Sequence, residues 1–371
     1  MQKAILVTGA SGFLGAQLCA DLLQAGYYVI GIGRKDAHNL SLSPRERGFL
    51  ETTTLQNPRF NYMRLELKNI DNKTLKNLKE YRIESCFHLA SMVEYASHNY
   101  HNYHNYTITP TLKCIALAKA LQIPHIIFSS TSSVIAAPTQ IATTPTNEAT
   151  PISPMTNYGL AKFVCEKLLE FATFNPHTTQ SVLESLLDSS LDSSTKSKAD
   201  SRVDSGLDSA KKQAELAHSK AFVPKVVCLR FPAIFGRNHL GGIIYDLAKE
   251  ALQGHDIELY NKGENLRNIL YVTDATKALI LAMQHIAEWE GGYHLFQLGS
   301  RDSQSVHTIA QLLVRYLHSS SHLILSTKPS PNNFNAILDT TKAQQMLHFK
   351  PMSIEEGIQA YCQDILEKGL L

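Results

Sequence analysis

The chain has 371 residues, 44% of them hydrophobic and 18% charged, and a net charge of +2 with its 16 histidines counted as neutral. This length allows one large domain or two ordinary ones with a substantial core, as expected of a soluble globular protein. The near-neutral balance gives no electrostatic reason to expect nucleic acid or an anionic membrane surface as a partner.

The six cysteines, at positions 19, 86, 114, 165, 228 and 362, are scattered and form no Cys-x-x-Cys pair. Most lie in apolar runs, so we expect reduced, buried thiols and no disulfide framework. The N-terminal stretch MQKAILVTGASGFLG lacks the charged start and long apolar core of a signal peptide. No uncharged apolar run approaches the ~18 residues of a membrane span. We therefore expect a cytoplasmic protein with no membrane partner.

The first third of the chain alternates short β-rich runs with helical patterns. Alternation at this spacing is typical of an α/β fold with a parallel sheet and helices on both faces. Strands are predicted at 3–9, 27–34, 84–90 and 125–130, and helices at 15–26, where Gly26 is the stop, and at 111–123. Later in the chain, strands are predicted at 224–231, 257–260 and 294–299, and helices at 242–253, 273–286 and 306–317.

Two stretches differ from this pattern. From about Pro176 to Lys220 the chain is rich in Ser and Asp, and few of its residues could fill a core. We expect an inserted, solvated loop there, disordered or loosely helical. At 97–106 the unit His-Asn-Tyr occurs three times. A period of three drifts around an α-helix, so the imidazoles of His98, His101 and His104 would not share one face, and we predict no metal site.

The stretch VTGASGFLG joins the first predicted strand to the first predicted helix. Gly9, Gly12 and Gly15 suit a tight turn, close approach of backbone to a pyrophosphate, and close packing of helix on strand. The helix N-terminus then faces the anion with free N–H groups. The context predicts a dinucleotide-binding turn. Its other cofactor-binding residues are Ser11, Phe13 and Leu14.

The end of the second strand indicates which dinucleotide is used. NAD-binding folds usually place an acid here to accept from the ribose hydroxyl. Gly33 fills that position and Arg34 follows it. A glycine leaves room for a 2′-phosphate and an arginine can pair with it, so NADP is favoured over NAD. Asp36 lies close enough to weaken the preference for NADP if the loop after this strand folds back. Glu66 could bind the adenine amine, or it could be a surface carboxylate.

In YGLAK, Tyr158 and Lys162 are four residues apart. On a helix such residues share a face. A nearby positive charge lowers the pKa of a phenol, so Tyr158 could exchange a proton with a substrate near neutral pH. The alternative is an ordinary surface pair.

With these pieces in order, the chain resembles the extended short-chain dehydrogenase/reductase family, which includes nucleotide-sugar epimerases, dehydratases and reductases. The resemblance covers nearly all of the chain outside 176–220. The matching segments are TGASGFLG at 8–15, HLAS at 88–91, IIFSSTSSV at 126–134, YGLAK at 158–162, LRFPAIFGR at 229–237, RNILYVTDA at 267–275 and the C-terminal 338–358.

The resemblance implies a role for three catalytic residues. Tyr158 would be the acid/base at the reacting oxygen, and Lys162 would hold the nicotinamide ribose and lower the pKa of the tyrosine. Thr131 would donate a hydrogen bond to the same oxygen, with Ser130 or Ser132 in that role if the register slips by one.

The resemblance also implies binding residues and a domain plan. Leu89, Ala90 and Ser129 would line the cofactor, and Arg237 and Arg267 would bind a nucleotide diphosphate or merely tie loops together. The fold would be a Rossmann-type doubly wound parallel sheet with a smaller C-terminal α/β substrate-binding lobe. We expect a Rossmann domain at 1–175, the insert at 176–220, and the last Rossmann strands interleaved with the lobe at 221–371.

Some family positions differ here and narrow the reaction. Thr107 and Pro110 stand where an Asn and a Gly are common, and Ala233 replaces a substrate-binding asparagine. Ser132 and Ser133 follow Thr131, so the acidic pair of a 4,6-dehydratase is missing. No cysteine between 114 and 165 could serve the fucose-type epimerase–reductase chemistry.

What remains is C4 epimerisation through a transient ketone, or reduction of a keto sugar, by an NAD(P)-dependent oxidoreductase acting on a nucleotide sugar. The alternatives are a reductase of a small non-sugar carbonyl compound and a non-catalytic NAD(P)-binding sensor. A homodimer through a helical face of the cofactor domain is usual in the family.

Overall fold

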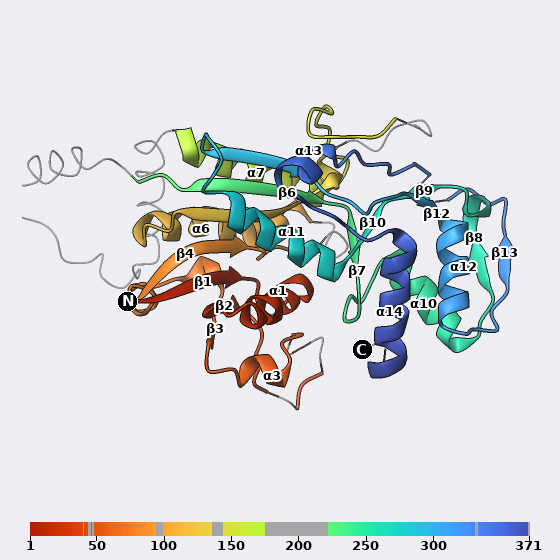
Figure 1. Ribbon diagram of the computed structural model, residues 1–371, viewed down its shortest axis with the longest axis horizontal. Coiled ribbons are helices and arrows are strands. Elements are labelled where there is room, and N and C mark those ends of the chain that lie inside the picture. The colour runs from red at the N-terminus through yellow and green to blue at the C-terminus, as the bar shows by residue number, and fades with distance from the viewer. Residues whose placement is uncertain are drawn as a thin grey trace, which may run out of the picture.

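The computed structural model describes residues 1–39, 41–43, 46, 48–93, 99–135, 144–174, 222–330 and 333–369. The insert predicted for 176–220 lies outside these described residues. Figure 1 shows a large sheet with its helices at one end of the molecule and a smaller lobe at the other.

The large sheet has seven parallel strands in the order β11-β6-β5-β4-β1-β2-β3. The chain runs outward from β1 to β3, then returns to add β4 on the other side of β1. The strand order therefore reverses between β1 and β4. Open α/β sheets bind ligands at the carboxyl ends of the strands where such a reversal occurs. The strands are β1 Gln2–Thr8, β2 Val29–Gly33, β3 Phe60–Arg64, β4 Tyr81–His88, β5 His125–Thr131, β6 Lys225–Phe231 and β11 Tyr293–Gln297.

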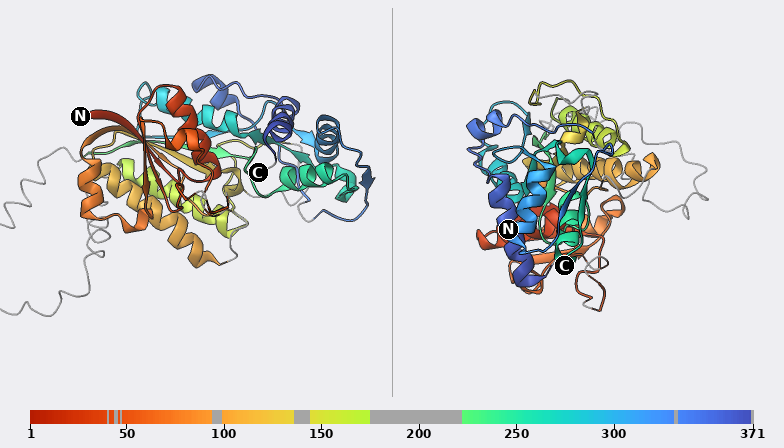
Figure 2. Two further views of the ribbon diagram at one scale, coloured as in Figure 1. Left: turned by 90° about the horizontal axis from the view of Figure 1, so that it is seen from below. Right: turned by 90° about the vertical axis from the view of Figure 1, so that its right-hand side faces the viewer.

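Helices cover both faces of this sheet (Figure 2). Leu18 and Leu22 of α1 and Leu279 of α11 join one buried cluster, while Ile115 of α6 and Leu169 of α7 join the cluster on the other face. Strands buried on both faces are rich in Val, Ile and Leu, which is why the sequence shows them as apolar runs. The helices of this part are α1 Phe13–Gln24, α3 Thr52–Leu55, α4 Asn72–Leu78, α5 Tyr100–Tyr103, α6 Thr109–Ala120, α7 Asn157–Phe174 and α11 Val272–His285.

Four short turns of other helix types matter for the site. They are η1 Leu67–Asn69, η3 Ser132–Val134 and η4 Tyr260–Gly263, with 3-10 geometry, and η2 His104–Ile108, a π-helical turn between α5 and α6. The His-Asn-Tyr repeat therefore runs from α5 into a π turn, an arrangement that is rare and often found at functional sites.

The smaller lobe is built from three two-stranded pairs and its own helices (Figure 1). Its core contains Ile309 and Leu313 of α12 and Ile358 and Tyr361 of α14. The pairs are β7 Ala233–Phe235 with β10 Ile269–Tyr271, β8 Ile257–Leu259 with β13 Leu323–Leu325, and β9 Leu266–Arg267 with β12 Gln304–Ser305; the helices are α10 Ile243–Gln253, α12 Val306–Tyr316 and α14 Ile354–Lys368. Helix α13 Thr341–Met346 instead packs on the large sheet, where Ala343 joins its core and Lys342 donates to the Leu295 carbonyl of β11.

The predicted α/β class with a doubly wound parallel sheet is confirmed. The segment predicted as a short strand at 294–299 forms β11, which pairs with β6 at the edge of the large sheet. The C-terminal part of the chain thus supplies both two strands of the large sheet and the whole of the smaller lobe.

Candidate active site

The glycine turn after β1 has no room for side chains. Gly9 has a φ of +75°, and a Cβ there would lie 2.8 Å from the Ala90 nitrogen. A Cβ on Gly15 would lie 2.2 Å from the Gly9 oxygen. Gly12 precedes α1, and no side chain in the described part of the chain caps that helix start. The first N–H groups of α1 therefore suit an anion, and the turn fits a dinucleotide pyrophosphate.

The end of β4 is tied to this turn by a buried histidine. The Ala90 N–H donates to the Thr8 hydroxyl over 3.3 Å. His88 Nδ1 lies 2.9 Å from the Thr8 hydroxyl and its Nε2 lies 3.0 Å from the Thr111 hydroxyl. These bonds hold Leu89 and Ala90 against Gly9.

The sequence predicted open space beside the glycine at the end of β2, and the structure differs. The space at Gly33 is not open: a Cβ there would lie 2.5 Å from the Ser11 hydroxyl and 2.6 Å from the Tyr62 hydroxyl. Two hydroxyl groups thus lie beside Gly33 at the end of β2. Asp36 pairs at 2.9 Å with Arg64, the β3 residue in register with Gly33, so the loop after β2 brings a carboxylate to this end of the sheet.

The helix that carries YGLAK packs closely on the end of β5. Thr156 precedes α7, and its hydroxyl accepts a hydrogen bond from the Gly159 N–H over 3.0 Å. A Cβ on Gly159 would lie 2.2 Å from the Ser133 oxygen. This glycine therefore lets the start of α7, with Tyr158, rest directly on the turn that follows Thr131.

Lys162 is buried beneath Tyr158. Its side chain is 2% exposed, and Nζ donates to the Ser129 carbonyl over 2.7 Å. Nζ lies 4.7 Å from the centre of the Phe128 ring and 5.9 Å from the centre of the Tyr158 ring. Burial lowers the pKa of Lys162 to about 8, so the amine is still charged at pH 7.

The structure separates Thr131 from its serine neighbours. Because side chains alternate along a strand, Ser130 points to the face opposite Thr131. Ser130 donates to Glu166 over 2.5 Å, and the same carboxylate receives both Nε and Nη2 of Arg230. Thr131 Oγ1 accepts from the Ser133 N–H over 3.1 Å, which leaves the hydroxyl hydrogen to donate elsewhere. The Ser130 hydroxyl is thus already hydrogen bonded to a buried carboxylate.

Thr107 occupies the place of the family's asparagine and makes its own contacts. Its buried hydroxyl accepts from the Met92 N–H over 3.1 Å and lies 3.2 Å from the Ser91 hydroxyl. It therefore anchors the segment after β4 from the π turn η2. The sequence shows the substitution but not this role, because Thr107 and Met92 are 15 residues apart and meet only in the folded chain.

The two arginines assigned to substrate have protein partners. Arg237 Nη2 lies 3.3 Å from a carboxylate oxygen of Glu51 at the start of α3. Arg267 donates to the carbonyls of Leu266 and Phe334, and its guanidinium lies 4.8 Å from the centre of the Phe334 ring. Burial lowers the pKa of Arg267. Both belong to the smaller lobe or its connection to β6.

Other expectations concern groups across the described part of the chain. All six cysteines are free and buried, as predicted. The rings of His101 and His104 are stacked, with their centres 6.5 Å apart. His98 lies outside the described residues. Among the residues that the structure describes, no group of three or more His, Cys, Asp or Glu side chains is placed to hold a metal. No helix in the described ranges is both long and apolar enough to cross a membrane.

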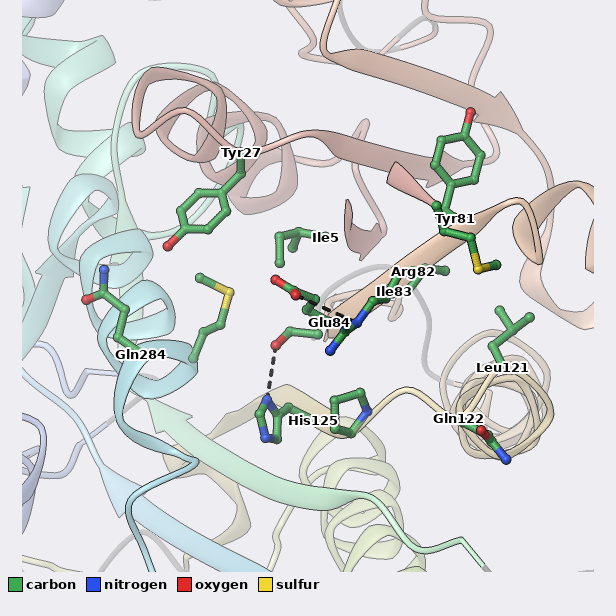
Figure 3. Close-up of a pocket in the computed structure, with 14 residues that line it drawn as sticks. Ile5, Tyr27, Tyr81, Arg82, Ile83, Glu84, Leu121, Gln122, His125 and Gln284 are labelled. Atoms are coloured by element: carbon green, nitrogen blue, oxygen red, sulfur yellow. Dashed lines mark hydrogen bonds and ion pairs between the residues drawn. The ribbon is translucent and has the colours of Figure 1, made fainter. Parts of the chain in front are cut away.

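A cavity of about 630 Å³ lies elsewhere (Figure 3). It is lined by the beginning of β4, including Tyr81 and Glu84, by His125 at the start of β5, and by Tyr27. Because β4 and β5 are parallel, their first residues lie at the opposite end of the strands from the glycine turn and Lys162. The cavity is therefore not part of the candidate active site.

A doubly wound parallel sheet, a glycine turn at its switch point and a Tyr/Lys pair beside the end of β5 define a dinucleotide-dependent oxidoreductase type of site. A model of the NAD dependent epimerase/dehydratase family matches residues 5–174 and 210–299, which is more than half of the chain. The chain belongs to this family and is an NAD(P)-dependent enzyme.

Known relatives of similar length carry related names. The chain is 24% identical over 365 residues to an uncharacterized UDP-glucose epimerase of Bacillus subtilis (strain 168), with 95% of each chain covered. The structure of Thermotoga maritima UDP-glucose 4-epimerase with UDP-glucose matches with a TM-score of 0.69, 21% identity and 99% of each chain covered. Bacillus cereus UDP-glucuronic acid 4-epimerase in complex with UDP-glucuronic acid and NAD matches with a TM-score of 0.67, 20% identity and 99% of each chain covered. At these identities the structural matches establish the fold alone.

Proposed function

We propose that the chain transfers hydride at a hydroxyl-bearing carbon of a nucleotide-activated sugar, as an epimerase or a keto-sugar reductase. The proposal is supported by the contact of Lys162 with the Tyr158 ring and the Ser129 carbonyl near the end of β5, and by the packing of Gly159 on the turn that follows Thr131. The UDP-sugar epimerases among the relatives support the choice of substrate class.

The residues that would hold the cofactor are those of the glycine turn and the end of β4, with Lys162 at the nicotinamide ribose. When bound, the nicotinamide accepts a hydride from the sugar carbon and can return it. Tyr158 takes the hydroxyl proton during oxidation and returns it during reduction. The buried positive charge of Lys162 stabilises the phenolate form of Tyr158, and Thr131 donates to the oxygen on which charge develops.

This proposal is tested by following the conversion of UDP-glucose, UDP-galactose and UDP-glucuronic acid by NMR, with NAD or NADP present. We expect an epimer of at least one of these sugars with the wild type, and a reduced sugar only when a keto sugar and NADPH are supplied instead. Tyr158→Phe should lower turnover roughly 10²–10⁴-fold while cofactor binding still raises the melting temperature. The control is Tyr100→Phe, which alters a more exposed tyrosine outside the site.

Wild-type turnover by Tyr158→Phe would remove the catalytic assignment. Conversion of a small ketone but of no nucleotide sugar would favour the second candidate, a reductase of small non-sugar carbonyl compounds. That candidate has one observation in its favour, because Arg267 is already held by two carbonyls and an aromatic ring.

We further propose that NADP is preferred to NAD. An acid after β2 would repel a 2′-phosphate, and the hydroxyls of Ser11 and Tyr62 occupy the place of such an acid beside Gly33. Arg34 follows with a side chain that is 53% exposed. In a thermal-shift titration at equal concentrations, NADP should raise the melting temperature more than NAD; a larger shift with NAD would contradict this preference.

We propose Arg237 as the better anchor for a substrate diphosphate. Its partner, Glu51, is 61% exposed, so a diphosphate can replace a weak surface ion pair. Arg267 would have to leave backbone carbonyls in a buried place. Arg237→Met should therefore raise the KM for a UDP-sugar more than it lowers kcat, and an unchanged KM would count against this role.

We also propose a homodimer through the outer face of α7 and a cytoplasmic location. Leu160 and Phe171 are exposed apolar residues on α7, and Phe163 and Val164 lie between them on the helix. Sedimentation should show a dimer that Phe171→Glu converts to a monomer, whereas Leu366→Glu, at an exposed site on α14, should leave the dimer intact.

The proposed cytoplasmic location is supported by the six free, buried thiols, which suit a reducing compartment.

A further inference from the structure

The three tyrosines of the His-Asn-Tyr repeat have different environments. Tyr100 is 37% exposed. Tyr106 lies beside Arg34 and Lys68, whose charged groups are 5.0 and 4.9 Å from the centre of its ring. Tyr103 is 1% exposed and is among the largest fully buried side chains in the described part of the chain. The repeat therefore sends one of its tyrosines into the core.

The histidine and asparagine side chains around Tyr103 bond to one another at the surface. Asn99 Oδ1 accepts from the His101 N–H over 2.9 Å, and Asn105 Nδ2 lies 3.0 Å from His101 Nε2. Tyr103 is the buried residue of the short helix α5. The polar groups of the repeat thus find partners on its outer side, while the ring of Tyr103 packs inward.

Tyr103 packs against the proposed catalytic tyrosine. The centres of the Tyr103 and Tyr158 rings are 6.3 Å apart and their planes are inclined by 56°, as is common for aromatic pairs. The close packing of Gly159 fixes the backbone beside Tyr158, but a phenol ring can still rotate about its side-chain bonds. Neighbours of the ring restrict that rotation, and Tyr103 is one of them, with Lys162 as another.

The hydroxyl of Tyr103 is anchored to the segment that follows β4. It donates to the Val93 carbonyl over 3.1 Å. The preceding residue, Met92, donates its N–H to the Thr107 hydroxyl of η2. The same segment begins with Leu89 and Ala90, which lie against the glycine turn. Tyr103 therefore connects Tyr158 with the chain beside the proposed cofactor site.

We propose that Tyr103 is a positioning residue for proton transfer by Tyr158. Its ring holds the Tyr158 ring in one orientation, and its hydroxyl fixes both rings relative to the residues after β4. The inference rests on the proposed function and adds a residue that acts through Tyr158. A displacement near 1 Å at a reacting group can lower kcat roughly 10²-fold. A core side chain can thus control turnover without changing how tightly the sugar binds.

The test compares Tyr103→Leu, which removes the ring, with Tyr103→Phe, which removes only the hydroxyl. The substrate is the nucleotide sugar that the wild type converts. Tyr103→Leu should lower kcat roughly 10²-fold and change KM by less than about threefold. Tyr103→Phe should lower kcat only about threefold to tenfold, as expected for the loss of one neutral hydrogen bond. If Tyr103→Leu does not fold by circular dichroism, Tyr103→Met replaces it, because its flexible side chain fills more of the space.

A double mutant separates this role from a general loss of structure. In a Tyr158→Phe background, Tyr103→Leu should lower the residual turnover by less than about threefold, because the phenol that it positions is already gone. A merely structural role would lower turnover by the same factor in both backgrounds. Two controls should keep the wild-type kcat well below their melting temperatures: Tyr100→Leu on the same helix, and Leu78→Ala, which removes a buried side chain of α4 shortly before the start of β4.

The other outcomes overturn distinct claims. Wild-type kcat in Tyr103→Leu, or an equal fall in both backgrounds, would overturn the positioning role and leave the proposed function in place. A fall in Tyr103→Phe as large as that in Tyr103→Leu would overturn the role of the ring. No conversion of any nucleotide sugar by the wild type would overturn the proposed function, and this inference with it.

Discussion

The two ends of the proposed cofactor site are built differently. At the catalytic end, Lys162 and Glu166 are almost completely buried, and backbone contacts at Gly159 and Ser129 set the geometry. At the adenosine end, Arg34, Lys68 and Tyr106 meet through side chains alone and are partly exposed. Chemistry that depends on fixed distances thus lies where packing is tight. The proposed choice between NADP and NAD would then depend on exposed charges, at positions where single substitutions cost little stability.

The largest expected effect is at the buried end. Glu166 accepts from Ser130 and from both Nε and Nη2 of Arg230. Glu166→Ala would leave a buried guanidinium without its counterion, which costs about 3–5 kcal/mol. Denaturant unfolding measures this loss. The matched control is Glu170→Ala, which removes a more exposed pair with Lys167 on the same helix and should cost about 0–1 kcal/mol. Equal losses in the two variants would contradict the claim that burial makes the Glu166–Arg230 pair costly to break.

The next effect concerns distance at the catalytic end. A Cβ on Gly159 would lie 2.2 Å from the Ser133 oxygen, so Gly159→Ala must push α7 away from η3. We expect a loss of about 1–3 kcal/mol in unfolding free energy and a fall in kcat of roughly 10² from a displacement near 1 Å. The cofactor dissociation constant should change much less. An unaltered kcat would show that Tyr158 does not need this contact.

A pH profile tests the buried amine. Burial lowers the pKa of Lys162 to about 8, so the charge is present below that pH and is lost above it. We expect kcat/KM of the free enzyme to fall about tenfold per pH unit above this value. The folded state also binds fewer protons than the unfolded state between about 8 and the ordinary value of 10.5. The contribution of Lys162 to unfolding free energy therefore rises with pH across that window.

The smallest effect is at the exposed end. Raising the salt concentration from 0.05 to 0.5 M should weaken binding of adenosine 2′,5′-bisphosphate severalfold more than binding of 5′-AMP, because exposed charges are screened. Turnover at saturating substrate should stay nearly constant, since Lys162 is shielded from solvent. Salt sensitivity of kcat equal to that of nucleotide binding would remove the distinction between the two ends.

Local sequence determined the features that depend on residues close together in the chain. The spacing of Gly9, Gly12 and Gly15 between an apolar strand and a helix was enough to predict the turn, because each glycine answers a local steric need. The spacing of Tyr158 and Lys162 predicted a shared helix face. The alternation of short β-rich runs with helical patterns predicted the parallel sheet, because parallel neighbours need a helical crossover between them.

Only the tertiary structure decided what distant residues do together. It joined Ser130 to Glu166 and Arg230, which separated Ser130 from Thr131. It placed Ser11 and Tyr62 over Gly33, and brought Tyr106 between Arg34 and Lys68. These contacts follow from strand order and from a π turn, and neither has a local signature that a single sequence reveals. Pairing across a sheet is set by the packing of the whole chain, so its consequences appear only when the chain is folded.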